Sequence, residues 1–287
     1  YIIGGHNGGY LNTIWSATMG DAPPLPTPTP TPTPTPVVVK FDLPFAYAGR
    51  PNATAKQFKT AFWSRLTAAF DHVFATGVFR PFTGTRYTPA DCLGGMVGIK
   101  CYDSHNGTDF SAKPGNAVYS VADGEVVFAS NHSGSSCVPN KGGFGCVVIV
   151  KYPGNIFGLY AHLKKILVSA TDYVTGSSLV GRMGKTGCPG CGVHLHFATL
   201  NPTVTASASL TMSSVDWEEL LYQIKPTKDL GFKPFCTYTA PNGTKFRFFD
   251  PFGWKGKGDD PWSKPKAEGG CGIESPYLWK FNVGISP

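Results

Sequence analysis

A proline-rich run near the N-terminus limits what this chain can fold into. Residues 23–36 begin Pro-Pro-Leu-Pro and continue as five Thr-Pro pairs, so proline stands at almost every second position. Proline fixes φ and lacks the backbone N–H that helices and central strands require, which leaves a polyproline II conformation. At ~3.1 Å per residue, the run is a stiff spacer of about 40 Å. The spacer separates a short piece, residues 1–22, from a body that begins at residue 37.

The spacer and the residues before it carry their own expectations. Residues 1–22 are too short to bury a core, so we expect an arm or the tail of a preceding domain. The first residue is Tyr1 rather than Met, which favours a processed product or a fragment. Threonines in Thr-Pro segments present exposed hydroxyl groups to glycosyltransferases. We therefore expect O-glycans on Thr27, Thr29, Thr31, Thr33 and Thr35.

The body is predicted to be rich in β-structure after one N-terminal helix. Phe58, Phe62, Leu66 and Phe70 recur four residues apart, which predicts an amphipathic helix over residues 56–74. Short apolar runs broken by glycine then predict strands, and the Asp123-Gly124 pair predicts a hairpin turn between two of them. The predicted strands are residues 117–122, 125–129, 146–152, 158–163 and 193–200.

Tight turns between successive strands favour an antiparallel sheet. We therefore predict a β-rich α+β fold: an antiparallel β-sheet core, an N-terminal helix and a loop-rich C-terminal extension. The segments expected after the spacer are an N-terminal extension at 37–100, a core at 101–200 and a C-terminal extension, packed on the core, at 201–287.

The cysteines indicate an oxidising compartment. Their number is even, and they lie next to or close to Gly, Pro or Asn in expected loops. Neighbours in sequence favour four disulfides: Cys92 with Cys101, Cys137 with Cys146, Cys188 with Cys191, and Cys236 with Cys271. A structural zinc ribbon is the competing interpretation, although only Cys188 and Cys191 have the C-x-x-C spacing that such a site requires twice.

Charge and hydropathy exclude several classes of protein. The formal net charge of +7 favours anionic partners, and nucleic acid, anionic cell-wall polymers and lipid headgroups would all qualify. The basic residues, however, form no run and are not interleaved with aromatic residues. Nucleic-acid binding is therefore not expected. No apolar stretch approaches the ~20 residues that a membrane-spanning helix needs, so we expect no membrane span.

Four histidines and one aspartate carry the chemical argument. His105 and Asp109 form an H-x-x-x-D motif, and His194 and His196 form H-x-H within an apolar strand. Side chains two apart in a strand project from the same face, so both of these imidazoles lie on one side of the sheet. A metal ion beside them would relieve their mutual repulsion. His162, in Tyr-Ala-His-Leu, occupies another predicted strand.

These motifs, in this order and with glycine-rich turns between them, resemble the lysostaphin-type zinc metallopeptidases, the peptidoglycan endopeptidase family. The resemblance runs from about Cys101 to Leu200. It implies that His105, Asp109 and His196 bind Zn²⁺, with a water at the fourth position. It also implies that His162 and His194 are catalytic, sharing proton transfer and oxyanion stabilisation while zinc activates the water.

The resemblance further implies a secreted bacterial enzyme that cuts the peptide part of peptidoglycan. In a strand-lined groove for that peptide, we expect Asn106, Tyr160 and the loop at 188–192 as wall elements. Other catalytic patterns compete poorly, because Gly184-Lys185-Thr186 lacks the first glycine of a phosphate-binding loop and G-x-S-x-G is absent.

A second hypothesis concerns assembly. Residues 1–36 could contact neighbouring subunits of an extracellular filament or surface assembly that reuses a peptidase fold, for example by strand addition.

Overall fold

A computed structural model describes the part of the chain that contains the predicted core. The described residues are 39–70, 100–101, 105–130, 132–133, 136–137, 143–188, 190–203, 215–223, 238–240, 242–254, 262 and 275–284. All of them belong to one unit, residues 36–287. The N-terminal arm, the spacer with its expected O-glycans, and the assembly contacts predicted for residues 1–36 lie outside the described residues.

Helix α1 (Ala55–Arg65) begins at a well-formed cap. The hydroxyl of Thr54 accepts the backbone N–H of Gln57, and the Gln57 side chain accepts the backbone N–H of Thr54. This reciprocal pair satisfies two of the N–H groups that a helix start leaves free. The helix buries Phe58 and Phe62 against the core.

The predicted extent of this helix was wrong at its C-terminal end. The chain becomes extended at Leu66 and continues as strand β1 (Leu66–Ala69), which pairs with β2 (Lys100–Cys101) and β3 (Thr108–Ser111). Leu66 follows Phe62 at helical spacing, yet ladder pairing on both sides of β1 outweighs that local pattern. Residues 71–74 of the predicted helix lie outside the described residues.

Most strands belong to two sheets, and the predicted antiparallel β-rich class is confirmed. The larger sheet runs β11-β5-β8-β9-β13-β3-β1-β2, with β15 also paired to β13 and β14 to β15. Its further strands are β5 (Gly124–Ala129), β8 (Val148–Tyr152), β9 (Ile156–Ala161), β11 (Tyr173–Val174), β13 (His194–Thr203), β14 (Tyr238–Thr239) and β15 (Lys245–Phe249). The second sheet consists of β4 (Ala117–Tyr119), β10 (Leu163–Ile166) and β12 (Leu179–Met183).

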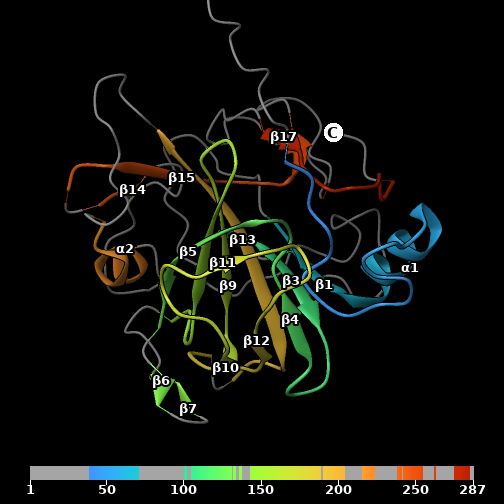
Figure 1. Ribbon diagram of the computed structural model, residues 1–287, viewed down its shortest axis with the longest axis horizontal. Helices are drawn as coiled ribbons and strands as arrows, with labels where there is room; N and C mark the ends of the chain where they lie inside the picture. The colour runs from blue at the N-terminus through green and yellow to red at the C-terminus, as the bar shows by residue number, and fades with distance from the viewer. Residues whose placement is uncertain are drawn as a thin grey trace, which may run out of the picture. The chain divides into compact units, whose positions relative to one another are not determined.

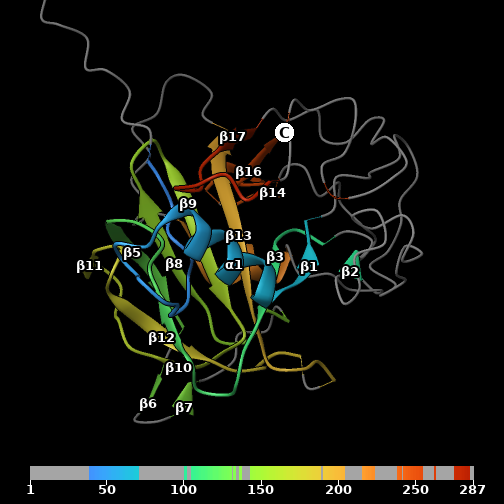
Figure 2. The same cartoon turned by 90° about the vertical axis from the view of Figure 1, so that its right-hand side faces the viewer.

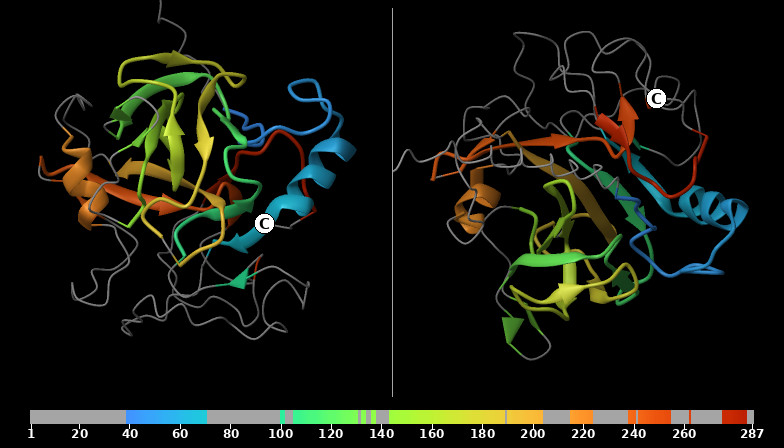
Figure 3. Two further views of the ribbon diagram at one scale, coloured as in Figure 1. Left: turned by 90° about the horizontal axis from the view of Figure 1, so that it is seen from below. Right: turned by 45° about the horizontal axis from the view of Figure 1, so that its top comes forward.

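The remaining elements are short. They are two-stranded pairs, β6 (His132–Ser133) with β7 (Ser136–Cys137) and β16 (Phe252–Trp254) with β17 (Ser275–Tyr277), and helix α2 (Trp217–Gln223). Helices α1 and α2 lie at opposite ends of the large sheet (Figure 3). Among the described residues, no helix combines the length and the apolar composition that crossing a bilayer requires.

The predicted hairpin at Asp123-Gly124 is wrong. Gly124 opens β5 in the large sheet, whereas β4, the preceding strand, belongs to the small sheet. This turn therefore carries the chain from one sheet to the other.

Strand β13 is a central strand of the large sheet. It runs through the middle of the large sheet, as Figures 1 and 2 show, and pairs with β9 on one side and with β3 and β15 on the other. On one face of β13, Leu195 and Phe197 are fully buried in a core that also contains Phe41, Phe110 and Trp279. Phe41 and Phe197 meet edge to face, with ring centroids 6.1 Å apart. The opposite face of β13 carries His194 and His196.

Candidate active site

The register of two strands brings the first ligand candidates together. In the antiparallel pair β3–β13, Asp109 is the direct partner of His196, and Ser111 is the partner of His194. Directly opposed residues project from the same face of a sheet. The Nδ1 atom of His196 therefore lies 3.0 Å from Oδ1 of Asp109.

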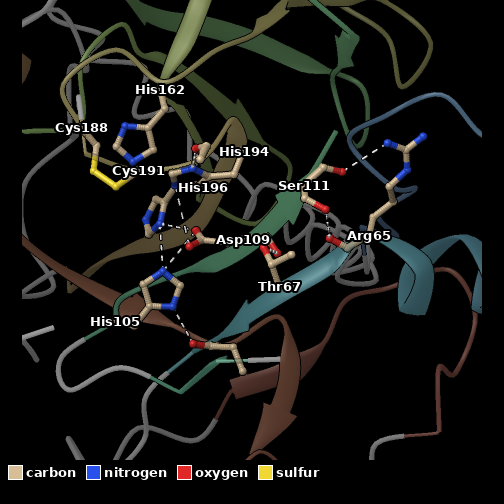
Figure 4. A network of polar contacts seen from close by, with 12 residues as sticks. Arg65, Thr67, His105, Asp109, Ser111, His162, Cys188, Cys191, His194 and His196 are labelled. Carbon is tan, nitrogen blue, oxygen red and sulfur yellow. Dashed lines mark hydrogen bonds and ion pairs between the residues drawn. A yellow bond between two sulfur atoms is a disulfide. The ribbon is translucent and has the colours of Figure 1, made fainter. Parts of the chain in front are cut away.

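His105 reaches the same point from the loop just before β3. Its Nδ1 lies 2.5 Å from the carbonyl oxygen of Ala69, at the end of β1. A carbonyl can only accept a hydrogen bond, so Nδ1 carries the proton and Nε2 carries the lone pair in the neutral ring. Nε2 lies 3.2 Å from Oδ1 of Asp109 and 3.2 Å from Nδ1 of His196 (Figure 4).

Burial and neighbouring charges set the ionisation of this cluster. Burial alone would raise the pKa of Asp109, but the imidazoles of His105, His196 and His194 outweigh it and hold that pKa well below its usual value. Burial lowers the pKa of His196, an effect that hydrogen bonding to Asp109 only partly opposes. At neutral pH, Asp109 is therefore a carboxylate and His196 a neutral imidazole, which are the forms of these side chains that bind metals.

The donor set fits a divalent metal ion such as zinc. One atom from each of His105, Asp109 and His196 lies within 4.8 Å of the others. With Nδ1 of His105 bound to Ala69, its Nε2 lone pair faces both the Asp109 carboxylate and Nδ1 of His196. Two imidazoles and one carboxylate are a ligand set common at zinc. A cation among these atoms would relieve the repulsion between the facing lone pairs.

The other two histidines stand beside this cluster. The ring centroids of His162 and His194 are 4.6 Å apart, and the centroids of His162 and His196 are 6.0 Å apart. Nε2 of His194 lies 3.8 Å from Oδ2 of Asp109. The structure therefore brings together all five residues that the sequence motifs predicted.

Backbone carbonyls orient both of these rings. Nδ1 of His162 lies 2.8 Å from the oxygen of Thr186, and Nδ1 of His194 lies 2.8 Å from the oxygen of Gly192. Each Nδ1 therefore carries a proton, and each Nε2 is left as the acceptor nitrogen. Burial, together with the neighbouring His194 and His196, lowers the pKa of His162 to about 3.

The loop that supplies both carbonyls is closed in two ways. The backbone N–H of His194 donates to Gly184 at 3.2 Å, and Cys188 is disulfide-bonded to Cys191, as predicted. Figure 4 shows this disulfide on the same side of the site as His162 and His194. Because Cys188 and Cys191 are bonded to each other, they cannot form one knuckle of the zinc ribbon that the C-x-x-C spacing also allowed.

The other predicted disulfides stay predictions. Cys146 is disulfide-bonded, but its predicted partner Cys137 has a side chain outside the described residues. The same holds for the side chains of Cys92, Cys101, Cys236 and Cys271.

One predicted wall element of the groove was wrong. Tyr160 is fully buried, it is the direct partner of Phe197, and its hydroxyl accepts the backbone N–H of Val121 at 2.9 Å. It therefore faces the core, on the side of the sheet opposite His196. Asn106 is 6% exposed beside His105, and its Nδ2 has no hydrogen-bond partner among the described residues.

Some residues that shape the site were not foreseen. Ala69, Thr186 and Gly192 act through backbone carbonyls, which every residue type carries, so no side-chain pattern could reveal them. Gly107 is different: a Cβ there would lie 2.6 Å from Cε1 and Nε2 of His196. The glycine inside His-Asn-Gly-Thr-Asp was the available signal for this close approach.

Comparison with known proteins gives a family match over the same region. Residues 103–207 match Peptidase family M23. Peptidoglycan DD-endopeptidase ShyA of Vibrio cholerae is 34% identical over 130 residues, which are 44% of this chain and 28% of that protein. DD-carboxypeptidase/endopeptidase Mpg of Neisseria meningitidis is 30% identical over 118 residues, 39% of this chain and 25% of that protein. The chain thus spans about a quarter of the length of each of these relatives.

One solved structure that is similar to this chain is the catalytic domain of the antimicrobial peptidase lysostaphin from Staphylococcus simulans. It is 26% identical, with a TM-score of 0.30 over 42% of this chain and 77% of that one. The family match agrees with the predicted resemblance over residues 103–207, and the names of the relatives agree with the predicted enzyme class, a metallo-endopeptidase. The match to peptidase family M23 thus covers residues 103–207, the stretch that contains His105, Asp109, His162, His194 and His196.

Proposed function

We propose that this chain is a secreted zinc metalloendopeptidase that hydrolyses peptide bonds in peptidoglycan cross-links. The observation that carries the proposal is the convergence of three donor atoms, Nε2 of His105, Oδ1 of Asp109 and Nδ1 of His196, at one buried point on β3 and β13. His162 and His194 lie beside that point. Their Nδ1 atoms bond to backbone carbonyls, so the Nε2 atom of each ring is available as a proton acceptor.

His105, Asp109 and His196 would hold the zinc ion. A set of three protein ligands, rather than four, is typical of a catalytic zinc site, which also takes up water or substrate. When bound there, zinc supplies Lewis-acid polarisation of the scissile carbonyl and activation of water. The carbonyl of Ala69 fixes the ring of His105 so that Nε2 faces the metal position.

His162 and His194 would move the proton. Each ring donates from Nδ1 to a backbone carbonyl, so each Nε2 can accept a proton from the attacking water and return it to the leaving amine. A protonated imidazole can also donate a hydrogen bond to the oxyanion that forms on the scissile carbonyl. We assign these two tasks to His162 and His194 jointly.

Peptidoglycan is the proposed substrate for two reasons. The relatives that match this chain include proteins named as peptidoglycan DD-endopeptidase and as DD-carboxypeptidase/endopeptidase. The net charge of +7 also favours contact with an anionic cell wall. Asn106, buried beside His105 with a free Nδ2 donor among the described residues, is our candidate for a hydrogen bond to the substrate peptide.

An extracellular location accords with the cysteines. Cys188 is bonded to Cys191 and Cys146 is also in a disulfide, and such bonds persist in oxidising compartments. We propose secretion on that basis. No observation on the described residues favours the alternative role as an assembly subunit.

The test separates metal binding from proton transfer. We expect His162→Ala and His194→Ala to retain one zinc per chain while losing cleavage of purified peptidoglycan in a zymogram. His105→Ala serves as the contrasting variant and should lose both zinc and cleavage. If His162→Ala and His194→Ala both cleave at the wild-type rate, the catalytic assignment is wrong.

A further inference from the structure

His162 has an unusual backbone conformation at the point where β9 ends. Its φ is 59°, in the left-handed region that residues other than glycine rarely adopt. Two backbone hydrogen bonds flank it: the N–H of His162 donates to Phe144 at 2.8 Å, and the N–H of Leu163 donates to Cys146 at 3.1 Å. Such conformations persist at functional sites only when surrounding contacts hold them.

Thr186 makes three hydrogen bonds around this histidine. Its carbonyl oxygen lies 2.8 Å from Nδ1 of His162. Its hydroxyl accepts the backbone N–H of Cys146 at 2.9 Å and donates to the carbonyl of Leu163 at 2.8 Å. The threonine thus bonds to the ring of His162, to the carbonyl of Leu163 after it, and to Cys146, whose own carbonyl accepts the N–H of Leu163.

Two glycines permit this close approach. A Cβ at Gly145 would lie 2.2 Å from the carbonyl carbon and oxygen of Thr186, and a Cβ at Gly187 would lie 2.3 Å from the backbone nitrogen of Gly145. Both glycines have a positive φ, 65° and 76°. The two loops therefore pack backbone against backbone, which leaves Thr186 little freedom to shift.

We propose that Thr186 is a positioning residue for His162. The Thr186 hydroxyl holds the loop at 184–187 against the backbone of Cys146 and Leu163. The Thr186 carbonyl then fixes the ring orientation and the Nδ1–H tautomer of His162. This inference rests on the proposed function, because it needs His162 to take part in proton transfer. It also explains Gly184-Lys185-Thr186, which ends like a phosphate-binding loop. Here the threonine hydroxyl binds two backbone groups of the protein itself.

The first test needs no substitution at Thr186. In the ¹⁵N NMR spectrum of histidine-labelled, zinc-loaded protein, the His162 signals are those absent from His162→Gln. We expect them to report a single Nδ1–H tautomer. A predominant Nε2–H tautomer would overturn the proposal, and neither result depends on cleavage activity.

The second test compares Thr186→Val with Thr186→Ser. Valine has a similar shape but lacks the hydroxyl, so we expect kcat to fall about 10- to 100-fold while KM and zinc content stay at wild-type values. We also expect the His162 NMR signals to show mixed tautomers. Serine retains the hydroxyl and should restore most of kcat and the single tautomer. Thr60→Val, at an exposed position of α1, is the matched control and should change nothing.

The outcomes separate this inference from the proposed function. If His162→Ala abolishes cleavage but Thr186→Val keeps kcat within twofold and a single Nδ1–H tautomer, the positioning role is wrong and the catalytic assignment stands. If His162→Ala cleaves at the wild-type rate, the catalytic assignment itself is wrong. Should Thr186→Val fail to fold, the wild-type tautomer and the behaviour of Thr186→Ser still decide the question.

Discussion

Gly107 lies directly against the ring of His196. A Cβ at position 107 would be 2.6 Å from Cε1 and Nε2 of that ring and 2.7 Å from the carbonyl oxygen of Phe197. Real Cβ atoms do not approach so closely, so any side chain at this position must shift the imidazole that we assign to zinc or the backbone of β13 that carries it. The glycine between the two other ligand candidates, His105 and Asp109, is therefore part of the site.

We predict that Gly107→Ala weakens zinc binding about 10- to 100-fold, the usual effect of disturbing the groups that orient a metal ligand. Competition with a chromogenic chelator measures the affinity. Gly190→Ala is the matched control, because a Cβ at Gly190 meets nothing within 4 Å. Equal zinc affinities for the two variants would contradict the importance of this contact.

The metal-free protein should lose stability in mild acid through His162. Its pKa in the folded state is lowered to about 3, so the folded protein keeps this ring neutral while the unfolded chain protonates it below about pH 6.5. The unfolded state then binds more protons, and the free energy of unfolding falls by about 1.4 kcal/mol per pH unit as pH drops through this window.

Urea unfolding of chelator-treated protein at pH 7 and pH 5 measures the effect. Relative to His162→Gln, the wild type should lose about 2 kcal/mol more between the two pH values. Parallel pH dependence in the two proteins would show that His162 is not held neutral in the fold.

The disulfide between Cys188 and Cys191 should matter for catalysis more than for zinc binding. It closes the loop whose Gly192 carbonyl orients His194, whereas the ligand candidates lie on β3, β13 and the loop before β3. We predict that the double variant Cys188→Ser, Cys191→Ser keeps wild-type zinc stoichiometry and loses kcat several-fold. A double variant with unchanged kcat would show that backbone hydrogen bonds alone hold the loop.

Tyr160→Phe separates a core role from a substrate contact. Removing the hydroxyl deprives the buried N–H of Val121 of its acceptor and also removes the hydroxyl bonded to Tyr152. We expect the free energy of unfolding to fall by about 1–3 kcal/mol. The values of kcat and KM should not change. A raised KM with unchanged stability would place Tyr160 in the groove after all.

Some ligand candidates could be found from the sequence because residues two apart in a strand project from the same face. H-x-H in an apolar strand places His194 and His196 on one face, and the structure adds that Asp109 is the register partner of His196. Spacing could not supply that register, since β3 and β13 are separated by most of the predicted core. The resemblance to a known family supplied the link.

The errors have equally specific causes. Tyr160 and His162 are two residues apart in one apolar run, so simple alternation places them on the same face. The left-handed φ of His162 breaks that alternation and turns its side chain to the site, while Tyr160 remains in the core. The helix predicted to residue 74 ends at Arg65 because β1 gains partners on both sides, and those partners are distant in sequence.

The central claim is that a metal ion held by His105, Asp109 and His196 makes this chain a peptidoglycan endopeptidase. The most direct measurement follows the new amino groups released from purified peptidoglycan by the wild-type protein as isolated, after chelation, and after zinc is restored. The account predicts release by the isolated protein, none after chelation, and recovery at one zinc per chain. Release that persists at full rate in fully metal-free protein would contradict it.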